Sequence, residues 1–279
     1  MPQGLHRARS SWLPLPHLAR RPQAPAVHND ATSSSESAMQ ADTIARMAPK
    51  DLIGKRVSIL DKGWIELQDV MGDDLAIVNA ARVSFLGESK GEEKDKRLLF
   101  YLMEHRHTSP FEQVEFKFRV RAPLVTWWQW VRHRTWSFNA QSGRYVAFDE
   151  DDFYVPSAWR MQSPTNKQAS LGALPNELGE PLTQALLAHY EASYRLYRQA
   201  LEIGVAREQA RLFLPGFAVY YTWVAKVDAH NLMHFLALRM AEDAQYEIRV
   251  YAQAIYEHFF KPALPWTAEA FERFVLQHH

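Results

Sequence analysis

The chain has 279 residues, 47% of them apolar and 23% charged, which is typical of a soluble globular protein with one large domain or two small ones. Its formal net charge of zero at pH 7 gives no overall basic field, so we expect no nucleic-acid partner. The sequence has no cysteine, which excludes disulfides and thiolate chemistry but fits both reducing and oxidising compartments. It has no run of 18 apolar residues, which predicts no membrane span, and we expect a cytoplasmic protein.

Residues 1–50 differ in composition from the rest of the chain. Four arginines precede the first acid, Asp30, among many prolines, and a run of three serines follows. This composition predicts a disordered N-terminal extension, followed by a single domain over residues 51–279. Two alternatives stay open for the extension: an organellar transit peptide, or an upstream start codon with Met39 or Met47 as the true start.

Short elements separated by turn signals follow the extension. Residues 57–60 and 64–70 are expected to form two strands, joined by a hairpin turn at Asp61-Lys62-Gly63. Residues 74–81 are expected to form a helix, which acidic residues at its start favour. Residues 94–105 are expected to form a second helix.

Residues 113–121 give the clearest strand pattern. Val114, Phe116, Phe118 and Val120 alternate with charged residues. Side chains of a strand point alternately to its two faces, so we expect one face to be buried and the other exposed.

The middle of the chain mixes one helix with polar segments. Residues 123–134 are expected to form a helix, since proline is tolerated in a first turn. Residues 137–143 are expected to form a polar loop, and residues 156–181 a turn-rich excursion at the surface.

The C-terminal third is expected to be mostly helical, with breaks at Gly204 and at Pro215-Gly216. The expected helices cover residues 182–204, 207–213, 217–240 and 243–260. An antiparallel sheet flanked by helices, with this helical C-terminal third, is an α+β fold.

The densest group of candidate binding residues lies between the middle helix and the polar loop. Arg132-His133-Arg134 places three basic side chains at the expected end of the helix, and the loop offers Ser142 and the backbone N–H of Gly143. Guanidinium groups and backbone amides are the usual means of binding phosphate without a metal. The alternative is a helix C-terminus neutralised by surface cations.

This segment resembles the signature of flavin-dependent thymidylate synthases, in which Arg-His-Arg is followed by seven residues and a serine, here Ser142. Other segments resemble further blocks of that family in the same order: residues 107–112, 210–215, 231–239 and 244–248. The resemblance covers roughly residues 57–266, which is most of the chain.

The resemblance implies a homotetrameric enzyme with active sites between subunits that methylates dUMP to dTMP. Methylenetetrahydrofolate would donate the carbon, FADH2 the hydride, and NADPH would reduce the flavin again; no metal is implied. Residues 51–279 would form the single catalytic domain. Flavin binding rests on the resemblance alone, because the sequence has no Gly-x-Gly-x-x-Gly motif of a dinucleotide-binding fold.

Carried over residue by residue, the resemblance implies two sets of site residues and two candidate catalytic residues. Arg239 would lie at the uracil ring and favour its N3-deprotonated form, and Ser142 would donate hydrogen bonds to the phosphate. The residues that would contact dUMP are Gln129, Arg132, Gln141, Ser142, Gly143, Arg144, Arg211 and Arg239. The residues that would line the flavin site are Ser109, Glu112, Arg132, His133, Arg134, Asp228, His230 and His234.

Elementary chemistry agrees with this role for Arg239. A fixed cation beside a weakly acidic ring nitrogen stabilises its anion, and negative charge on the ring makes C5 a better nucleophile. Helical spacing puts Arg239 on one face with Leu232, Phe235 and Leu236, so a buried guanidinium there requires a partner. The alternative is a structural ion pair with a carboxylate.

Two other groups of residues have alternative interpretations. His230 and His234 share a helix face as zinc ligands often do, but the glutamate of the metalloprotease motif is missing. Trp127, Trp128 and Trp130 could stack on the bases of single-stranded nucleic acid, although such clusters are more often packing residues.

The sequence departs from the family pattern at two positions. Ala140 stands where many members carry glutamate, and Asp243 where members often carry histidine. These changes leave open a protein that binds dUMP without turnover.

Overall fold

The computed structural model describes residues 48–278. The expected extension over residues 1–50, with both alternatives for it, therefore lies almost entirely outside the described residues. The single catalytic domain over residues 51–279 stays a prediction. Within the described residues, no helix is long and apolar enough to cross a membrane.

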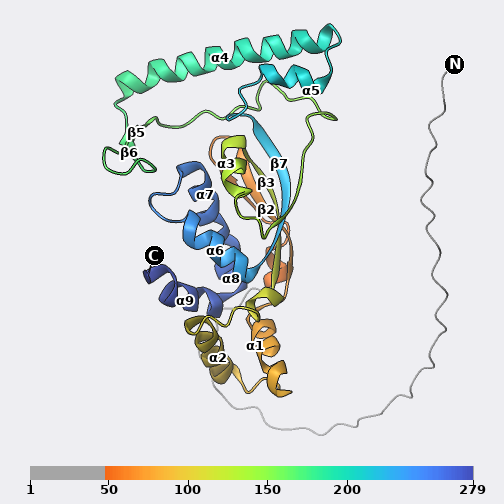
Figure 1. The fold of residues 1–279 in the computed structure, drawn as a ribbon, viewed down its shortest axis with the longest axis vertical. Coiled ribbons are helices and arrows are strands. Elements are labelled where there is room, and N and C mark those ends of the chain that lie inside the picture. The colour runs from red at the N-terminus through yellow and green to blue at the C-terminus, as the bar shows by residue number, and fades with distance from the viewer. Residues whose placement is uncertain (1–47, 279) are drawn as a thin grey trace, which may run out of the picture. The chain divides into compact units, whose positions relative to one another are not determined.

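A five-stranded antiparallel sheet carries the architecture of these residues (Figure 1). Its strands, in spatial order, are β1 (Arg56–Ile59), β2 (Gly63–Met71), β3 (Glu115–Pro123), β7 (Tyr220–Asp228) and β4 (Ser137–Ala140). Strands β1 and β2 form the expected hairpin, and their register starts at the pair Ile59 and Gly63. The antiparallel sheet of the expected α+β fold is confirmed.

Strand β3 confirms the alternation expected around residues 113–121. Phe116, Phe118 and Val120 are fully buried, whereas Lys117 and Arg119 between them are exposed. Because β3 lies in the middle of the sheet, its buried face contributes to the main hydrophobic core.

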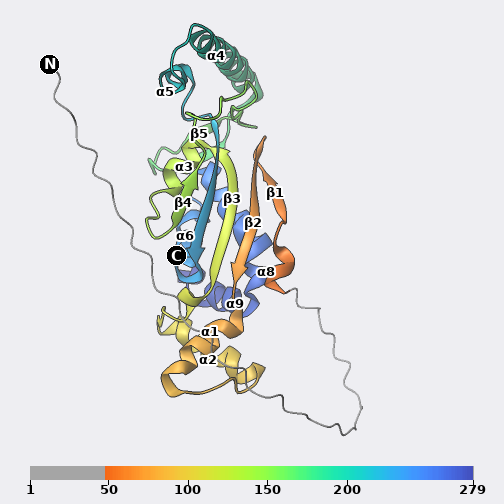
Figure 2. The same ribbon diagram turned by 90° about the vertical axis from the view of Figure 1, so that its right-hand side faces the viewer.

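Helices pack against this buried face of the sheet (Figure 2). They are α3 (Leu124–Trp130), α6 (Ala229–Arg239), α7 (Tyr246–Ile255), α8 (Lys261–Ala263) and α9 (Pro265–Phe274), while α1 (Asp74–Arg82) and α2 (Glu92–Glu104) lie at one end of the sheet. Trp130 joins the layers, because its ring centroid lies 5.4 Å from that of Trp223 on β7, 4.9 Å from Phe235 on α6 and 6.2 Å from Tyr251 on α7. This contact fixes α3 and α6 relative to each other.

A second, smaller core forms under the long helix α4 (Asn176–Glu202) and the short α5 (Arg207–Ala210). Tyr197 of α4 is fully buried there, and its hydroxyl accepts the backbone N–H of Phe148 at 3.2 Å. The expected surface excursion contains a small hairpin, β5 (Arg160–Gln162) and β6 (Ser170–Ala173), and the first turns of α4.

The expected helix over residues 217–240 is confirmed for Ala229–Arg239, which form α6, and is wrong for the residues before it. Tyr220–Asp228 instead form strand β7, which pairs with β3 on one side and β4 on the other. Its aromatic and β-branched residues favour a strand, and both neighbours satisfy its backbone. The chain enters α6 at Asp228, whose Oδ1 accepts the N–H of Asn231 at 2.9 Å and caps the helix.

Several expected boundaries also change. The expected loop over residues 137–143 begins with strand β4, because the free edge of β7 is available for pairing. The expected helix over 123–134 ends at Trp130, which leaves the Arg-His-Arg segment in turns between α3 and β4. Helix α4 begins at Asn176 rather than 182, and α7 at Tyr246 rather than 243. The expected helix end at 260 is followed by α8 and α9.

Candidate active site

The Arg239 guanidinium, at the last residue of α6, lies half-buried against the end of α3. Its Nε donates to Nε2 of His133 at 2.9 Å. Its Nη1 and Nη2 donate to the side-chain and backbone oxygens of Gln129, both at 3.3 Å. Three of its five N–H groups are therefore used, which leaves one on each terminal nitrogen.

His133 is a buried, neutral acceptor for this arginine. Only 7% of the residue is exposed. Burial, together with the positive charges of Arg239 and His234, lowers the pKa of His133 from 6.5 to about 4. The imidazole is consequently uncharged at neutral pH, and its Nε2 is free to accept the hydrogen bond.

No carboxylate forms an ion pair with Arg239 within residues 48–278. Burial, and then repulsion from Arg132, lowers the pKa of the guanidinium. Because a buried cation without an anion is costly, this arrangement favours a ligand anion over the structural ion pair considered for Arg239.

The segment after β4 is tied to β7 by its first residue. The N–H of Gln141 donates to the carbonyl of Thr222 at 2.8 Å, and the N–H of Thr222 donates to Gln141 Oε1 at 3.2 Å. The hydroxyl of Tyr221 donates to the carbonyl of Gln141. Tyr221 also contacts Trp127 of α3, with ring centroids 5.8 Å apart, so this segment and the Arg239 cluster share α3 as a support.

Ser142 and Gly143 then form a tight turn. The N–H of Arg144 donates to Ser142 Oγ at 3.3 Å. Gly143 is buried, and a Cβ on it would lie only 2.8 Å from the Phe148 ring. A glycine is required here because no side chain fits between the turn and this ring.

Two arginines converge on the same turn and both contact Glu208, Arg144 through its carboxylate and Arg211 through its backbone carbonyl. Nε of Arg144 lies 3.2 Å from Glu208 Oε2, and Nε of Arg211 donates to the Glu208 carbonyl at 3.3 Å. A surface ion pair of this kind is worth little, so an incoming anion can replace the Glu208 carboxylate at low cost. Arg132, Arg144 and Arg211 are all exposed, so the guanidinium groups of the candidate phosphate site are accessible.

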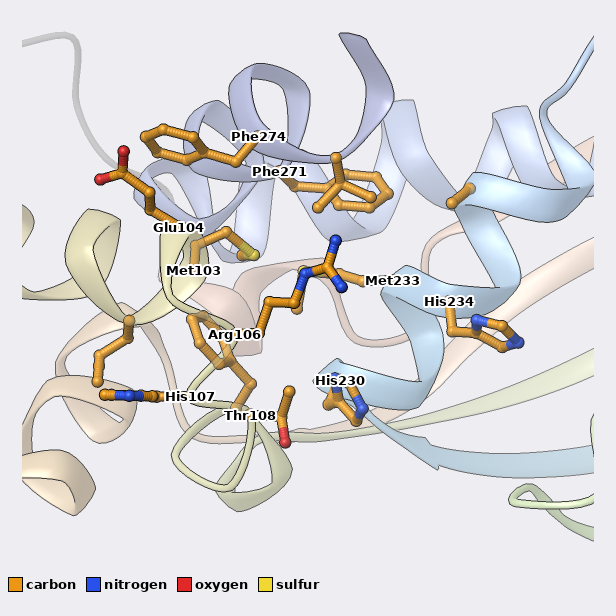
Figure 3. Close-up of a pocket in the computed structure, with 14 residues that line it drawn as sticks. Met103, Glu104, Arg106, His107, Thr108, His230, Met233, His234, Phe271 and Phe274 are labelled. Carbon is orange, nitrogen blue, oxygen red and sulfur yellow. The ribbon is translucent and has the colours of Figure 1, made fainter. Parts of the chain in front are cut away.

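A cavity of about 720 Å³ lies on the far side of His234 (Figure 3). His230 and His234 of α6 line it, together with Thr108 and Phe111 from the segment after α2. The His133 and His234 rings lie 6.0 Å apart, so the cavity adjoins the Arg239 cluster. Its size is in the range of cofactor sites.

The remaining residues expected at the flavin site do not line this cavity. Ser109, Glu112 and Arg134 are exposed, and their side chains make no hydrogen bond or ion pair within the described part of the chain. Asp228 is engaged as the cap of α6, because its two carboxylate oxygens accept the N–H and the side-chain amide of Asn231 at 2.9 and 2.7 Å.

The alternative interpretations gain little from the structure. In the described residues, no three His, Asp or Glu side chains come together as a metal-binding group. Of the tryptophans considered for base stacking, Trp130 is fully buried and Trp127 packs on β7, so only Trp128 is exposed. Two residues of the candidate site, Tyr221 and Glu208, were not expected from the sequence. Their partners lie elsewhere in the chain, so no local sequence pattern identifies them.

The chemistry of the site follows from these three neighbouring parts. The turn at Ser142 with its arginines suits a phosphate, Arg239 suits an anionic or polar ring edge, and the cavity suits a planar group. Together they could hold a nucleotide beside a ring-shaped cofactor.

Comparison with known proteins gives consistent matches. A family model described as "Thymidylate synthase complementing protein" matches residues 66–266. The flavin-dependent thymidylate synthase from one strain of Thermus thermophilus is 50% identical over 221 residues, which are 79% of this chain and 80% of that protein. The protein of the same name from Thermosipho africanus is 45% identical over 216 residues, or 77% of this chain and 93% of that one.

Solved structures give the same result. The UMP/dUMP methylase PolB from Streptomyces cacaoi, bound with 5-Br dUMP, matches with a TM-score of 0.69 and 36% identity. The match covers 76% of this chain and 96% of that chain. A second structure of PolB, bound with 5-Br UMP, gives a TM-score of 0.68 and 35% identity over 76% of this chain and 95% of that one.

Proposed function

This chain belongs to the family of flavin-dependent thymidylate synthases, and on that premise we propose that it methylates dUMP at C5 to give dTMP. Methylenetetrahydrofolate donates the carbon, and NADPH reduces the flavin. FAD, when bound and reduced, supplies the hydride that completes the methyl group. The observation that carries the proposal is the half-buried Arg239 guanidinium, held by neutral partners and without a carboxylate among the described residues.

In this proposal the turn at Ser142 binds the phosphate of dUMP. Ser142 contributes its hydroxyl, Gly143 its backbone N–H, and Arg144 and Arg211 contribute positive charge. The phosphate takes the place of the Glu208 carboxylate beside Arg144, a surface contact at 3.2 Å. A dianion bound by two guanidinium groups gains more than this exposed pair loses.

Arg239 acts on the uracil ring. Its two unused N–H groups donate to the ring, and its charge stabilises the anion formed when N3 loses its proton. Negative charge on the ring increases the nucleophilicity of C5. Gln129 and neutral His133 hold the guanidinium by hydrogen bonds without neutralising it, so its full charge acts on the substrate.

The cavity beside His234 fits a flavin ring. Met233 and Phe271 provide apolar walls, while His230 and His234 provide polar edges that can hydrogen-bond to ring nitrogen and oxygen atoms. The exposed Ser109, Glu112 and Arg134 would contact a flavin shared with another subunit. We therefore propose a homotetramer with composite sites.

The visible spectrum of the purified protein tests this function. Flavin bands should bleach with NADPH under anaerobic conditions and return only when dUMP and methylenetetrahydrofolate are both present, with formation of dTMP. A protein that binds dUMP but never couples flavin oxidation to dTMP formation would contradict the proposal. Such a result would favour a protein that binds dUMP without turnover, the alternative that Ala140 and Asp243 leave open.

A further inference from the structure

Helix α2 ends in a backbone motif whose key position normally holds glycine. The N–H of His107 donates to the Leu102 carbonyl at 2.8 Å, and the N–H of Arg106 donates to the Met103 carbonyl at 3.1 Å, which is the Schellman pattern. Arg106 occupies the left-handed position, with φ of 56°. A side chain is strained there, and strained residues are concentrated at functional sites.

The Arg106 side chain extends into the cavity beside His234. Figure 3 shows it crossing the middle of the cavity toward Phe271. No carboxylate within residues 48–278 forms an ion pair with its guanidinium. The ionisable groups that face it are Glu104 at the end of α2, His107 beyond it, and His230 and His234 of α6, while α9 contributes only apolar side chains.

The walls near Arg106 suit an aromatic ring. Met103, in the last turn of α2, lies on one side, and Phe271 and Phe274 of α9 lie on the other. A ligand that combines a planar ring with an anionic group would satisfy both the walls and the cation.

The anion suited to this place is a carboxylate rather than a pyrophosphate. The C-terminus of α2 presents carbonyl groups with partial negative charge, and Glu104 adds a further negative charge, so a multiply charged phosphate is disfavoured. The cavity lining includes no glycine, which is a common feature of phosphate sites. The first turn of α6 borders the cavity at His230, but the carboxylate of Asp228 already caps that helix end by accepting the N–H of Asn231.

We propose that Arg106 binds a glutamate carboxylate of the folate co-substrate, whose benzoyl ring packs between Met103 and the phenylalanines of α9. This inference rests on the proposed function, because that function requires a folate. The flavin occupies the part of the cavity nearer His234, so both reacting groups lie toward Arg239.

The substitutions R106G and R106Q test the site with the flavin-loaded, full-length protein. Glycine relieves the left-handed strain, so R106G should unfold at or above the wild-type temperature. Both variants should bind folic acid about 10-fold to 100-fold more weakly, the usual loss for a charge-assisted hydrogen bond. Folic acid with its glutamate carboxylates converted to amides should bind all three proteins equally. R97Q, on the exposed face of α2, is the charge-matched control and should bind folic acid like the wild type.

Two outcomes would overturn the inference. One is equal binding of folic acid by R106G and wild type. The other is a parallel loss of flavin content in R106G and R106Q, which would assign Arg106 to a phosphate of FAD. Failure of the proposed function has a different signature, namely that wild-type protein forms no dTMP. If the wild type forms dTMP and R106G has the same KM for methylenetetrahydrofolate as the wild type, only the role of Arg106 is refuted.

Discussion

The substitution His133→Phe tests how Arg239 is held. Phenylalanine keeps a ring against Phe235, which lies 4.9 Å from the imidazole centroid, but it cannot accept the hydrogen bond from Arg239 Nε. Leaving a partly buried charged donor unpaired costs about 1–2 kcal/mol. A protein of this size then loses about 2–8 °C in melting temperature at neutral pH. Without this hydrogen bond the Arg239 guanidinium keeps its charge but is no longer held in position, so kcat should fall about 10-fold to 100-fold.

The pH dependence of the same variant gives a sharper test. The pKa of His133 is about 4 in the folded protein and about 6.5 in the unfolded chain, so the unfolded state takes up the proton first. Wild-type stability from this group is therefore fully present above pH 6.5 and is lost as the pH falls toward 4. At pH 5 the wild type has lost about 2 kcal/mol of its free energy of unfolding through this group. The Phe variant lacks the group and should not show this loss.

Chemical denaturation of both proteins at pH 7 and pH 5 measures this difference. The wild type should be the more stable protein at pH 7, and the gap should close or reverse at pH 5. His133→Gln, whose amide oxygen can accept from Arg239, should recover part of kcat and also lack the pH dependence. If His133→Phe loses as much stability as the wild type between these pH values, the assignment of His133 as a buried, neutral imidazole is wrong.

Further substitutions test the other parts of the site. Arg239→Ala should lower dTMP formation about 100-fold to 1000-fold while flavin content stays unchanged, and full turnover by this variant would exclude its action on N3. Ser142→Ala should weaken dUMP binding about 3-fold to 10-fold, measured by titration, and flavin reduction by NADPH should persist. Gly143→Ala should displace the turn, because the new Cβ would lie 2.8 Å from the Phe148 ring. We expect it to weaken dUMP binding more than Ser142→Ala does, and the reverse order would show that the turn is not a phosphate site.

The sequence predicted those parts of the fold whose signal is local. Strand β3 has a regular alternation and was located within two residues of its observed start. Strand β7 was mistaken for a helix because its mostly apolar sequence, with only Thr222 and Lys226 as polar residues before Asp228, has no clear period of two. Only its pairing with β3 and β4 identifies it as a strand, and that pairing is not visible in a single sequence.

The site was predicted as a set of residues but not as a set of contacts. The resemblance named both residues but assigned His133 to the flavin site and Arg239 to dUMP. They are 106 residues apart and form one hydrogen-bonded unit in the structure. Arg106 was missed because its significance lies in its backbone conformation, and the sequence alone gives no reason to expect an arginine at a left-handed position.

The capping of α6 by Asp228 sets the position of the guanidinium at the other end of that helix. Arg239 lies 11 residues beyond the cap, so helical rise places it about 16 Å along the helix axis from Asp228, the last residue of β7. Inserting one residue into α6 would turn Arg239 by about 100° around the helix axis and away from Gln129. Insertions or deletions should therefore abolish activity inside α6 and be tolerated in the exposed β5–β6 hairpin. Among homologous chains, the length of the hairpin should vary and the length of the helix should stay constant.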